Sequence, residues 1–319
     1  MRLMLLDSAS LYYRAYFGVP ESVTAPDGTP VNAVRGFLDM IATLVAAQRP
    51  TRLVACWDDD WRPDFRVAAI ASYKSHRVAQ ERSGVDVEQT PDTLLPQVPV
   101  IIDVLAALGI ARVGHPGFEA DDVIATLSER AHCPVDIVTG DRDLFQLVDD
   151  EREVRVLYTG KGVRNLEVVD QARLAARYGV SSGRGYAEMA LLRGDPSDGL
   201  PGVAGIGEKT AVGLLSRYGG LAPLLAAVQA GDPGISAGQR AKLAAARDYL
   251  ARATTVVQVV RDIAIAPVDD ALRAEPADVR ALGALAQQWG LRSSINRVLA
   301  ALAAAEAPPS PVPAQASTD

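Results

Sequence analysis

Over about the first 160 residues, short apolar segments alternate with longer segments of helical periodicity. The segments that predict β-strands are Leu3–Leu6, Leu53–Trp57, Ile110–Val113, Val135–Val138 and Val154–Tyr158. The clearest helical pattern spaces apolar residues by threes and fours from Leu94 to Leu108, and Gly109 ends it. Alternating strands and helices predict an α/β fold, with a mostly parallel central sheet flanked by helices. Such sheets place functional sites at the carboxyl ends of their strands.

The pattern changes near residue 181. From there Ala, Leu, Arg and Gly predominate and predict short helices with glycine-rich joints, apart from a β-branched run at Thr254–Val260. We therefore expect a core over residues 1–180 and a helical region over residues 181–306. Residues 307–319 are rich in Pro, Ala and Ser, which predicts a disordered tail. Within the core, residues 75–90 are polar and lack periodicity, which is typical of a functional or mobile loop.

The amino-acid composition indicates the general class of protein. The chain has 319 residues, of which 49% are hydrophobic and 22% charged, so it is long and apolar enough for about two globular domains. It has two cysteines and no apolar stretch of membrane-spanning length, so we expect a cytoplasmic protein with reduced thiols. Its formal net charge of −7 argues at first against a nucleic-acid partner.

The acidic residues gather at the ends of four predicted strands. The acids that follow these strands in turn are Asp7, then Asp58, Asp59 and Asp60, then Glu119, Asp121 and Asp122, then Asp141 and Asp143. Two carboxylates about 4 Å apart repel by about 4 kcal/mol at an effective dielectric near 20, so a shared pocket needs a counter-charge. Oxygen ligands without a suitably spaced histidine favour Mg²⁺ or Mn²⁺ over Zn²⁺.

Each acid also has a structural alternative. Asp7 taken alone could simply cap a helix, Asp59 and Asp60 are typical of a solvated turn, and Asp122 could complement a helix dipole. Capping does not readily explain four acidic clusters at four different strand ends, so a metal site is the favoured interpretation.

Residues 194–219 contain a glycine-rich segment, GDPSDGLPGVAGIGEKTAVGLLSRYG. Glu208 separates Gly207 from Lys209, which excludes a Walker loop. The segment instead predicts a helix–hairpin–helix turn that grips a DNA backbone through glycine amides and Lys209, with an ordinary helical turn as the alternative. The acids just upstream, Asp195 and Asp198, could reach the strand-end pocket. The basic side chains between positions 62 and 82 could guide a nucleic-acid strand. They are Arg62, Arg66, Lys74, Arg77 and Arg82.

Taken together, these motifs resemble the flap endonucleases, or structure-specific 5′-nucleases, which include the 5′-3′ exonuclease domain of bacterial DNA polymerase I. The resemblance runs from Met1 to about Ala305. Its motifs, in chain order, are Asp7 followed by Tyr13-Arg14, then Trp57-Asp58, FRVAAIASYKSHR, FEADDV, TGDRDLFQL and GDPSDGLPGVAGIGEKTA.

The resemblance implies a PIN-like nuclease core with a helical arch at about residues 74–95, and a DNA-binding hairpin at residues 201–211 that packs back on the core. It implies metal ligands at Asp7, Asp58, Glu119, Asp121, Asp122, Asp141, Asp143, Asp195 and Asp198. Lys74 and Arg77 are expected near the scissile phosphate. The expected DNA-binding residues are Tyr13, Arg14, Arg66, Gly202, Gly205, Gly207, Lys209 and Thr210. The family also implies a K⁺ ion on the hairpin carbonyls.

The expected function is therefore that of a stand-alone 5′-3′ exonuclease and flap endonuclease in replication and repair. Two Mg²⁺ or Mn²⁺ ions about 4 Å apart, with room for a third, are expected to assist hydrolysis of the phosphodiester. The expected substrates are DNA with 5′ flaps, nicks, gaps or 5′ ends, and RNA primers. We expect a monomer that acts with a separate DNA polymerase and ligase and away from membranes.

The sequence departs from the family pattern in three places: Gly199 replaces the usual Asn, Ser8 replaces the usual Gly, and the WDDDW run leaves open which of its acids is the ligand. We take Asp58, directly after the Trp. The alternatives are a related metal-dependent ribonuclease, a phosphatase, which Ala9 disfavours, and a catalytically silent DNA-junction binder. Without the nine expected ligands, 30 acidic residues face 32 basic ones, so the net charge does not exclude DNA.

Overall fold

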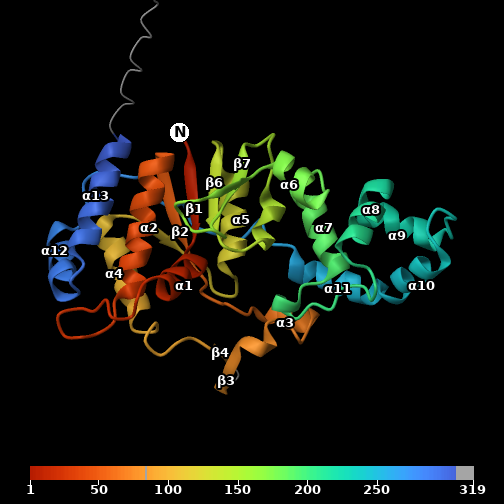
Figure 1. The fold of residues 1–319 in the computed structure, drawn as a ribbon, viewed down its shortest axis with the longest axis horizontal. Coiled ribbons are helices and arrows are strands. Elements are labelled where there is room, and N and C mark those ends of the chain that lie inside the picture. The colour runs from red at the N-terminus through yellow and green to blue at the C-terminus, as the bar shows by residue number, and fades with distance from the viewer. Residues whose placement is uncertain (83–84, 307–319) are drawn as a thin grey trace, which may run out of the picture.

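A six-stranded sheet forms the centre of the protein, which we describe from a computed structural model over residues 1–82 and 85–306 (Figure 1). Its strands are β1 (Leu3–Asp7), β2 (Arg52–Cys56), β5 (Ala111–Val113), β6 (Val135–Thr139), β7 (Val154–Tyr158) and β8 (Glu167–Val169). The order is β5-β2-β1-β6-β7-β8, and all neighbours are parallel except β7 and β8. The five predicted strands and the mostly parallel α/β sheet are confirmed, and the three-residue β8 was not predicted.

Both faces of the sheet are covered, because successive residues of a strand point to opposite sides. In β1, Met4 and Leu6 belong to one hydrophobic cluster and Leu3 and Leu5 to the other. The first cluster contains α1 (Ser8–Gly18), α2 (Asn32–Gln48), α4 (Gln97–Leu108), α12 (Val279–Gln288) and α13 (Arg292–Glu306). The second contains α3 (Asp64–Ala69), α5 (Ala120–Arg130), α6 (Gln171–Tyr178), α7 (Gly183–Arg193), α8 (Glu208–Tyr218), α9 (Leu221–Gln229), α10 (Ala237–Ala245) and α11 (Arg247–Val257).

The last two helices return to the first half of the chain. Leu282 of α12 and Val298 and Leu302 of α13 are buried in the same cluster as Phe37 and Ile41 of α2. Figure 1 shows α12 and α13 beside α2 and α4, at the opposite end of the molecule from α8–α10. The expected assignment of all of residues 181–306 to a DNA-binding region therefore does not describe α12 and α13, which complete the core.

Two other expectations about the second half have different outcomes. The β-branched run Thr254–Val260 forms no strand, because helix α11 continues to Val257. The expected disordered tail, residues 307–319, lies outside the described residues. Gly109 ends α4 in the left-handed conformation (φ 78°), as predicted, although α4 begins only at Gln97.

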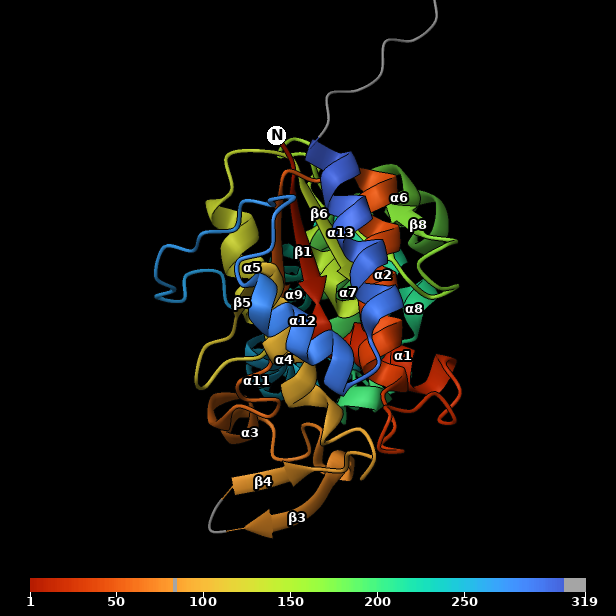
Figure 2. The same cartoon turned by 90° about the vertical axis from the view of Figure 1, so that its left-hand side faces the viewer.

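The expected helical arch over residues 74–95 is wrong. After a 3₁₀ turn at Ser75–Arg77, the chain forms the antiparallel strands β3 (Val78–Arg82) and β4 (Val85–Glu88). Val85 and Val87 alternate with acidic residues, a period that favours a strand over a helix. In Figure 2 this pair projects from the end of the molecule toward which the arrowhead of β1 points.

Among the described residues, no single helix is both long and apolar enough to cross a membrane. Helices α8 and α9 reach that length only as a pair bent by 83°.

Candidate active site

A pocket of about 720 Å³ opens at the carboxyl ends of the parallel strands. Eight acidic residues line it. Glu88 comes from β4, and the other seven come from β1, from the segments that follow β2, β5 and β6, and from the turn after α7. These seven are Asp7, Asp58, Glu119, Asp121, Asp141, Asp143 and Asp195. The expected convergence of strand-end acids in one pocket is therefore confirmed, while their role as metal ligands stays a prediction.

Asp7 both ends a strand and begins a helix. As the N-cap of α1 it accepts a hydrogen bond from the Ser10 amide (3.2 Å), and its other oxygen accepts one from the Thr139 hydroxyl (2.6 Å). Thr139 is the last residue of the neighbouring strand β6. The capping role and the pocket role of Asp7 thus coexist, because β1 ends where α1 begins.

The pocket carboxyl groups are short of positive charge. Burial raises the pKa of Asp7 to about 6. The hydrogen bonds from Thr139 and Ser10 oppose this rise, and the charge of Asp141 adds to it. Burial also raises the pKa of Asp58 to about 7, with Asp7 adding to the effect. The pKa values of Asp121 and Asp143 lie well above the ordinary value, through burial first and the charge of Asp141 second. Crowded carboxylates without a counter-ion behave in this way.

Two cations face these acids, as expected. The Lys74 ammonium lies 2.9 Å from a Glu119 oxygen. Burial alone would lower its pKa, but Glu119 and the other acids around it raise it well above its usual value. Arg77 lines the same pocket and lies 3.7 Å from Asp198. Lys74 adopts the left-handed conformation (φ 47°), which is uncommon for a residue with a side chain.

The structure distinguishes the three acids of the WDDDW run. Asp58 lines the pocket and accepts a hydrogen bond from the Ala120 amide (2.8 Å). Asp59 instead pairs with Arg112 at 3.1 Å, and Asp60 accepts a bond from the Arg62 amide. The choice of Asp58 as the pocket acid agrees with this arrangement.

Asp122 and Arg66 are not in the pocket, and both expectations about them are wrong. Arg66 is 1% exposed and donates to both Asp122 oxygens, at 2.8 and 2.6 Å. Asp122 is 0% exposed and also accepts from the amides of Glu119 (3.2 Å) and Val260 (2.8 Å). With all its acceptor sites used, Asp122 has none left for a metal. Arg66 lies outside the pocket with its guanidinium bonded to Asp122, so it is not placed to contact DNA. One helical step of about 100° turns Asp122 away from the side that Asp121 faces.

The two acids before the glycine-rich hairpin differ in position. Asp195 lines the pocket and accepts from the Ser197 amide (2.9 Å), which starts the short 3₁₀ helix Pro196–Asp198. Asp198 is partly buried beside Arg77 and is not among the pocket-lining residues. Burial raises its pKa to about 6; Lys74 lowers it and Asp141 raises it, so Asp198 still senses the pocket charges.

The hairpin at residues 201–211 leads into α8. The Gly202 amide donates to the Tyr249 hydroxyl (3.0 Å), so the predicted contact of this amide with a phosphate is wrong. Among the described residues we find no backbone acceptor for the amides of Gly205 and Gly207, and Gly207 is the N-cap of α8. Lys209 is exposed and Thr210 partly exposed on the first turn of α8. These positions are compatible with phosphate binding, and the K⁺ ion stays a prediction.

Tyr13 and Arg14 of α1 line different cavities. Tyr13 lines the acidic pocket, and its hydroxyl bonds Thr90 at 3.0 Å. Arg14 instead lines a separate cavity of about 520 Å³ between α1, α2 and the loop that carries Lys161 and Arg164. DNA binding by either residue stays a prediction.

Comparison with known proteins identifies the family. The model of the 5′-3′ exonuclease N-terminal resolvase-like domain matches residues 2–179, and the model of the 5′-3′ exonuclease C-terminal SAM fold matches residues 182–280. The chain belongs to the 5′-3′ exonuclease family. It is a 5′-3′ exonuclease, a nuclease of the hydrolase class, as its motifs indicated.

The relatives of this exonuclease include stand-alone proteins. It is 61% identical to a 5′-3′ exonuclease of Streptomyces coelicolor, over 94% of this chain and 100% of the relative. It is 51% identical to a 5′-3′ exonuclease of Mycobacterium tuberculosis, over 94% and 97%. It is also 38% identical to DNA polymerase I of Mycobacterium bovis, of which it spans 32% of the length.

Solved structures share the fold at low identity. The bacteriophage T5 5′-exonuclease superposes with a TM-score of 0.60 at 17% identity, over 96% of this chain and 100% of the other. The catalytic core of Rad2 superposes with a TM-score of 0.57 at 17% identity, over 94% and 92%.

Several pocket residues of the exonuclease were not predicted. They are Tyr12, Trp61, His76, Glu88, Gln89, Arg142, Tyr158, Tyr186 and Arg193. Arg142 and Arg193 stand inside or next to the acidic motifs TGDRDLFQL and GDPSD, which is a signal that could have indicated them. The tyrosines lie within apolar segments, where a sequence does not distinguish a pocket wall from a buried core. Lys242 was also missed, although its ammonium lies so near Gly205 that an added Cβ there would meet it at 2.5 Å.

Proposed function

We propose that this 5′-3′ exonuclease hydrolyses DNA phosphodiesters at 5′ flaps and 5′ ends with divalent metal ions, Mg²⁺ or Mn²⁺, held by the pocket acids. The observation that carries the proposal is the convergence of eight acidic residues, several with raised pKa values, in the pocket at the carboxyl end of the sheet. Two solved structures of the same fold support it, because one contains metal ions and the other a DNA substrate. One is a T5 5′-exonuclease with bound zinc, and the other is a Rad2 core in complex with a DNA substrate.

The residues of the pocket suit a hard divalent cation. The carboxylates of Asp7, Asp58, Asp121, Asp141 and Asp143 offer only oxygen, the donor that Mg²⁺ and Mn²⁺ prefer. The raised pKa values of Asp58, Asp121 and Asp143 support this, because a positive charge near these carboxylates would stabilise them. As they stand, the described acidic side chains include no group of three that could hold one ion, so binding requires side-chain rearrangement. When bound, the ions supply positive charge and an activated water.

The chain's own cations orient the scissile phosphate. Lys74 and Arg77 face the acids from the β3–β4 side of the pocket. A phosphodiester between them and the acids would accept hydrogen bonds from both, which fixes its phosphorus for attack and offsets charge that develops on its oxygens. Glu119 holds the Lys74 ammonium in place at 2.9 Å.

Beyond the pocket, the hairpin is proposed to hold the duplex. The amides of Gly205 and Gly207 have no backbone acceptor among the described residues, and Lys209 is exposed on the first turn of α8, an arrangement that suits a backbone phosphate. Action in replication and repair, beside a separate polymerase and ligase and on RNA primers as well as DNA, belongs to the same proposal, as does a K⁺ ion at the hairpin.

The test uses a 5′-labelled flap DNA with Mg²⁺, with EDTA, and with the variant Asp141→Asn. Cleavage should require Mg²⁺ and fall by at least about 100-fold in the variant, since loss of a partner of a metal ligand already costs 10- to 100-fold. Asp59→Asn, near the pocket but paired with Arg112, is the matched control and should cut normally. Flap DNA that stays intact in Mg²⁺, or that Asp141→Asn cuts at the wild-type rate, would refute the proposal.

The hairpin is tested by the salt dependence of duplex binding. Lys209→Ala should weaken binding of all sequences equally and reduce the slope of log K against log salt by about one. Arg280→Ala, an exposed cation of α12 at the opposite end of the molecule from the hairpin, is the control. A slope unchanged by Lys209→Ala would remove this lysine from the interface.

A further inference from the structure

The acidic pocket has a second wall that the proposed mechanism does not use. Lys74 and Arg77 stand on the β3–β4 side, while Arg142, Tyr158, Tyr186 and Arg193 line the side formed by β7 and α7. We call these four residues the α7 wall. The pocket volume of about 720 Å³ is in the range of whole-ligand sites, about 300–1,000 Å³, so there is room beyond the phosphate that is cut.

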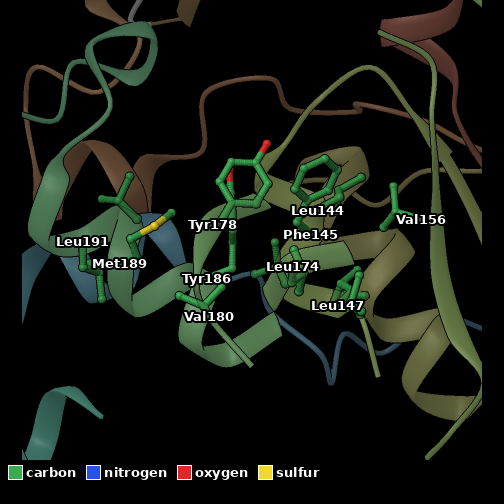
Figure 3. Close-up of a cluster of buried hydrophobic side chains, with 14 of the residues drawn as sticks. Leu144, Phe145, Leu147, Val156, Leu174, Tyr178, Val180, Tyr186, Met189 and Leu191 are labelled. Atoms are coloured by element: carbon green, nitrogen blue, oxygen red, sulfur yellow. The ribbon is translucent and has the colours of Figure 1, made fainter. Parts of the chain in front are cut away.

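Tyr186 gives this wall a buried donor. The residue is 1% exposed, and its hydroxyl has no hydrogen-bond partner among the described residues. Its ring packs against both Phe145 and Tyr178, with ring centroids 5.3 and 5.1 Å away (Figure 3). Burial raises its pKa, so the hydroxyl keeps its proton and remains a donor. A buried hydroxyl without a partner is costly, and a ligand that supplies an acceptor removes that cost.

Two arginines line the same pocket as Tyr186. They are Arg142 and Arg193, and the charges of both act on Tyr186. Arg142 is exposed between Asp141 and Asp143. Guanidinium groups beside a fixed phenol donor recognise a phosphate well, because they supply both charge and directed hydrogen bonds.

Arg193 also gives the wall a direction. Its guanidinium bonds Glu208 at 3.1 Å, and it lies 3.8 Å from Asp195. Glu208 is the first residue of α8, next to Lys209. The α7 wall is therefore the side of the acidic pocket that leads to the hairpin. A strand that runs from the pocket to the hairpin would pass along it.

We propose that the α7 wall binds the phosphodiester next to the scissile one, on its 3′ side, where the cut strand continues toward the hairpin. The inference rests on the proposed function and adds a subsite to it. Arg142 contributes charge and Tyr186 a hydrogen bond to the same phosphate. Because this phosphate does not react, both contacts stabilise bound substrate and transition state alike, and their loss raises KM and leaves kcat nearly unchanged.

The experiment compares Arg142→Gln and Tyr186→Phe with the wild type on two flap DNAs in Mg²⁺. One DNA is unmodified, and the other has a neutral methylphosphonate in place of the phosphodiester immediately 3′ of the cut site. On unmodified DNA, KM should rise about tenfold in each variant, the effect of losing one hydrogen bond to a charged group. On methylphosphonate DNA, Arg142→Gln should match the wild type, because the charge that it recognises is gone.

Two controls separate binding from folding. Arg184→Gln removes an exposed guanidinium of α7 that pairs with Glu188 outside the pocket. Tyr218→Phe removes another buried hydroxyl without a partner, at the end of α8. Both should keep the wild-type KM. Tyr186→Phe should unfold at the wild-type temperature or above it, since it loses only an unpaired hydroxyl.

The outcomes distinguish this inference from the function on which it rests. Wild-type cleavage with an unchanged KM in both variants would overturn the α7 wall and leave the proposed function standing. If the KM of Arg142→Gln is also tenfold above the wild-type value on methylphosphonate DNA, the α7 wall would be overturned as well. A wild-type protein that leaves unmodified flap DNA uncut in Mg²⁺ would overturn the proposed function and this inference together.

Discussion

Asp121 and Asp122 are neighbours in the chain and lie in opposite environments. Asp121 lines the acidic pocket, where burial and the charges of Asp141 and Asp7 raise its pKa. Asp122 pairs with Arg66 in what we call the Arg66 cluster, which Glu119 connects to the pocket, and it accepts four hydrogen bonds there. Both regions are buried and acidic, but only one balances its charge with protein groups. A carboxylate whose acceptor sites are filled supports the fold, whereas crowded and underpaired carboxylates are available to a cation.

The largest effect should come from breaking the Arg66 cluster. Arg66→Met leaves Asp122 buried without its cation, and the free energy of unfolding should fall by about 3–5 kcal/mol, measured by denaturant titration. Arg297→Met is the matched control, since Arg297 pairs with Asp39 at the surface and should change stability by about 1 kcal/mol or less. Equal losses in the two variants would contradict the distinction between a buried cluster and a surface pair.

Removing a pocket acid should raise the free energy of unfolding, whereas breaking the Arg66 cluster lowers it. The pKa of Asp58 is raised to about 7 in the folded protein, so folding favours its protonated form and stability falls as pH rises from about 4 through 7. Asp58→Asn should therefore stabilise the metal-free protein by about 2 kcal/mol at pH 8 in EDTA, with little gain near pH 4. Asp59→Asn should show no such gain at either pH. An Asp58→Asn variant less stable than the wild type at pH 8 would show that this carboxylate is already balanced.

The smallest expected effect is stabilisation of the fold by Mg²⁺, which should depend on the acidic pocket and not on the Arg66 cluster. Excess Mg²⁺ at pH 8 should raise the unfolding temperature of the wild type by about 2–4 °C, since binding to the folded state alone stabilises it by about 1 kcal/mol or more. Asp58→Asn should lose most of this rise. NaCl at the same ionic strength controls for general screening, and a rise of equal size with NaCl would argue against ion binding in the pocket.

The sequence was sufficient for features that depend on local pattern. The strand ends carrying Asp7, Asp58 and Asp141 were placed correctly, because apolar strands followed by acids converge in any parallel sheet. The separation of Asp121 from Asp122 was not predictable in this way. It depends on Arg66 and on the amide of Val260, which lie far away in the chain.

Other errors have related causes. The helical arch was inferred from the family resemblance against a local alternation of Val85 and Val87 that favours strands, and the local pattern was correct. The return of α12 and α13 to α2 depends on which apolar faces meet, and the sequence of either segment alone does not contain that information. Tyr186 of the α7 wall resembles a core residue because its ring is in fact buried.

The central claim is that the acidic pocket performs the reaction while the adjacent Arg66 cluster maintains the fold. The most direct test is the cleavage rate of 5′-labelled flap DNA per folded molecule, for Asp121→Asn and Asp122→Asn side by side, with unfolding temperatures recorded for both. We predict that Asp121→Asn is at least as stable as the wild type and at least about 100-fold slower. Asp122→Asn should unfold at a lower temperature and, while folded, cut within about tenfold of the wild-type rate. The opposite pattern, a fast Asp121→Asn and a stable but inactive Asp122→Asn, would contradict the claim.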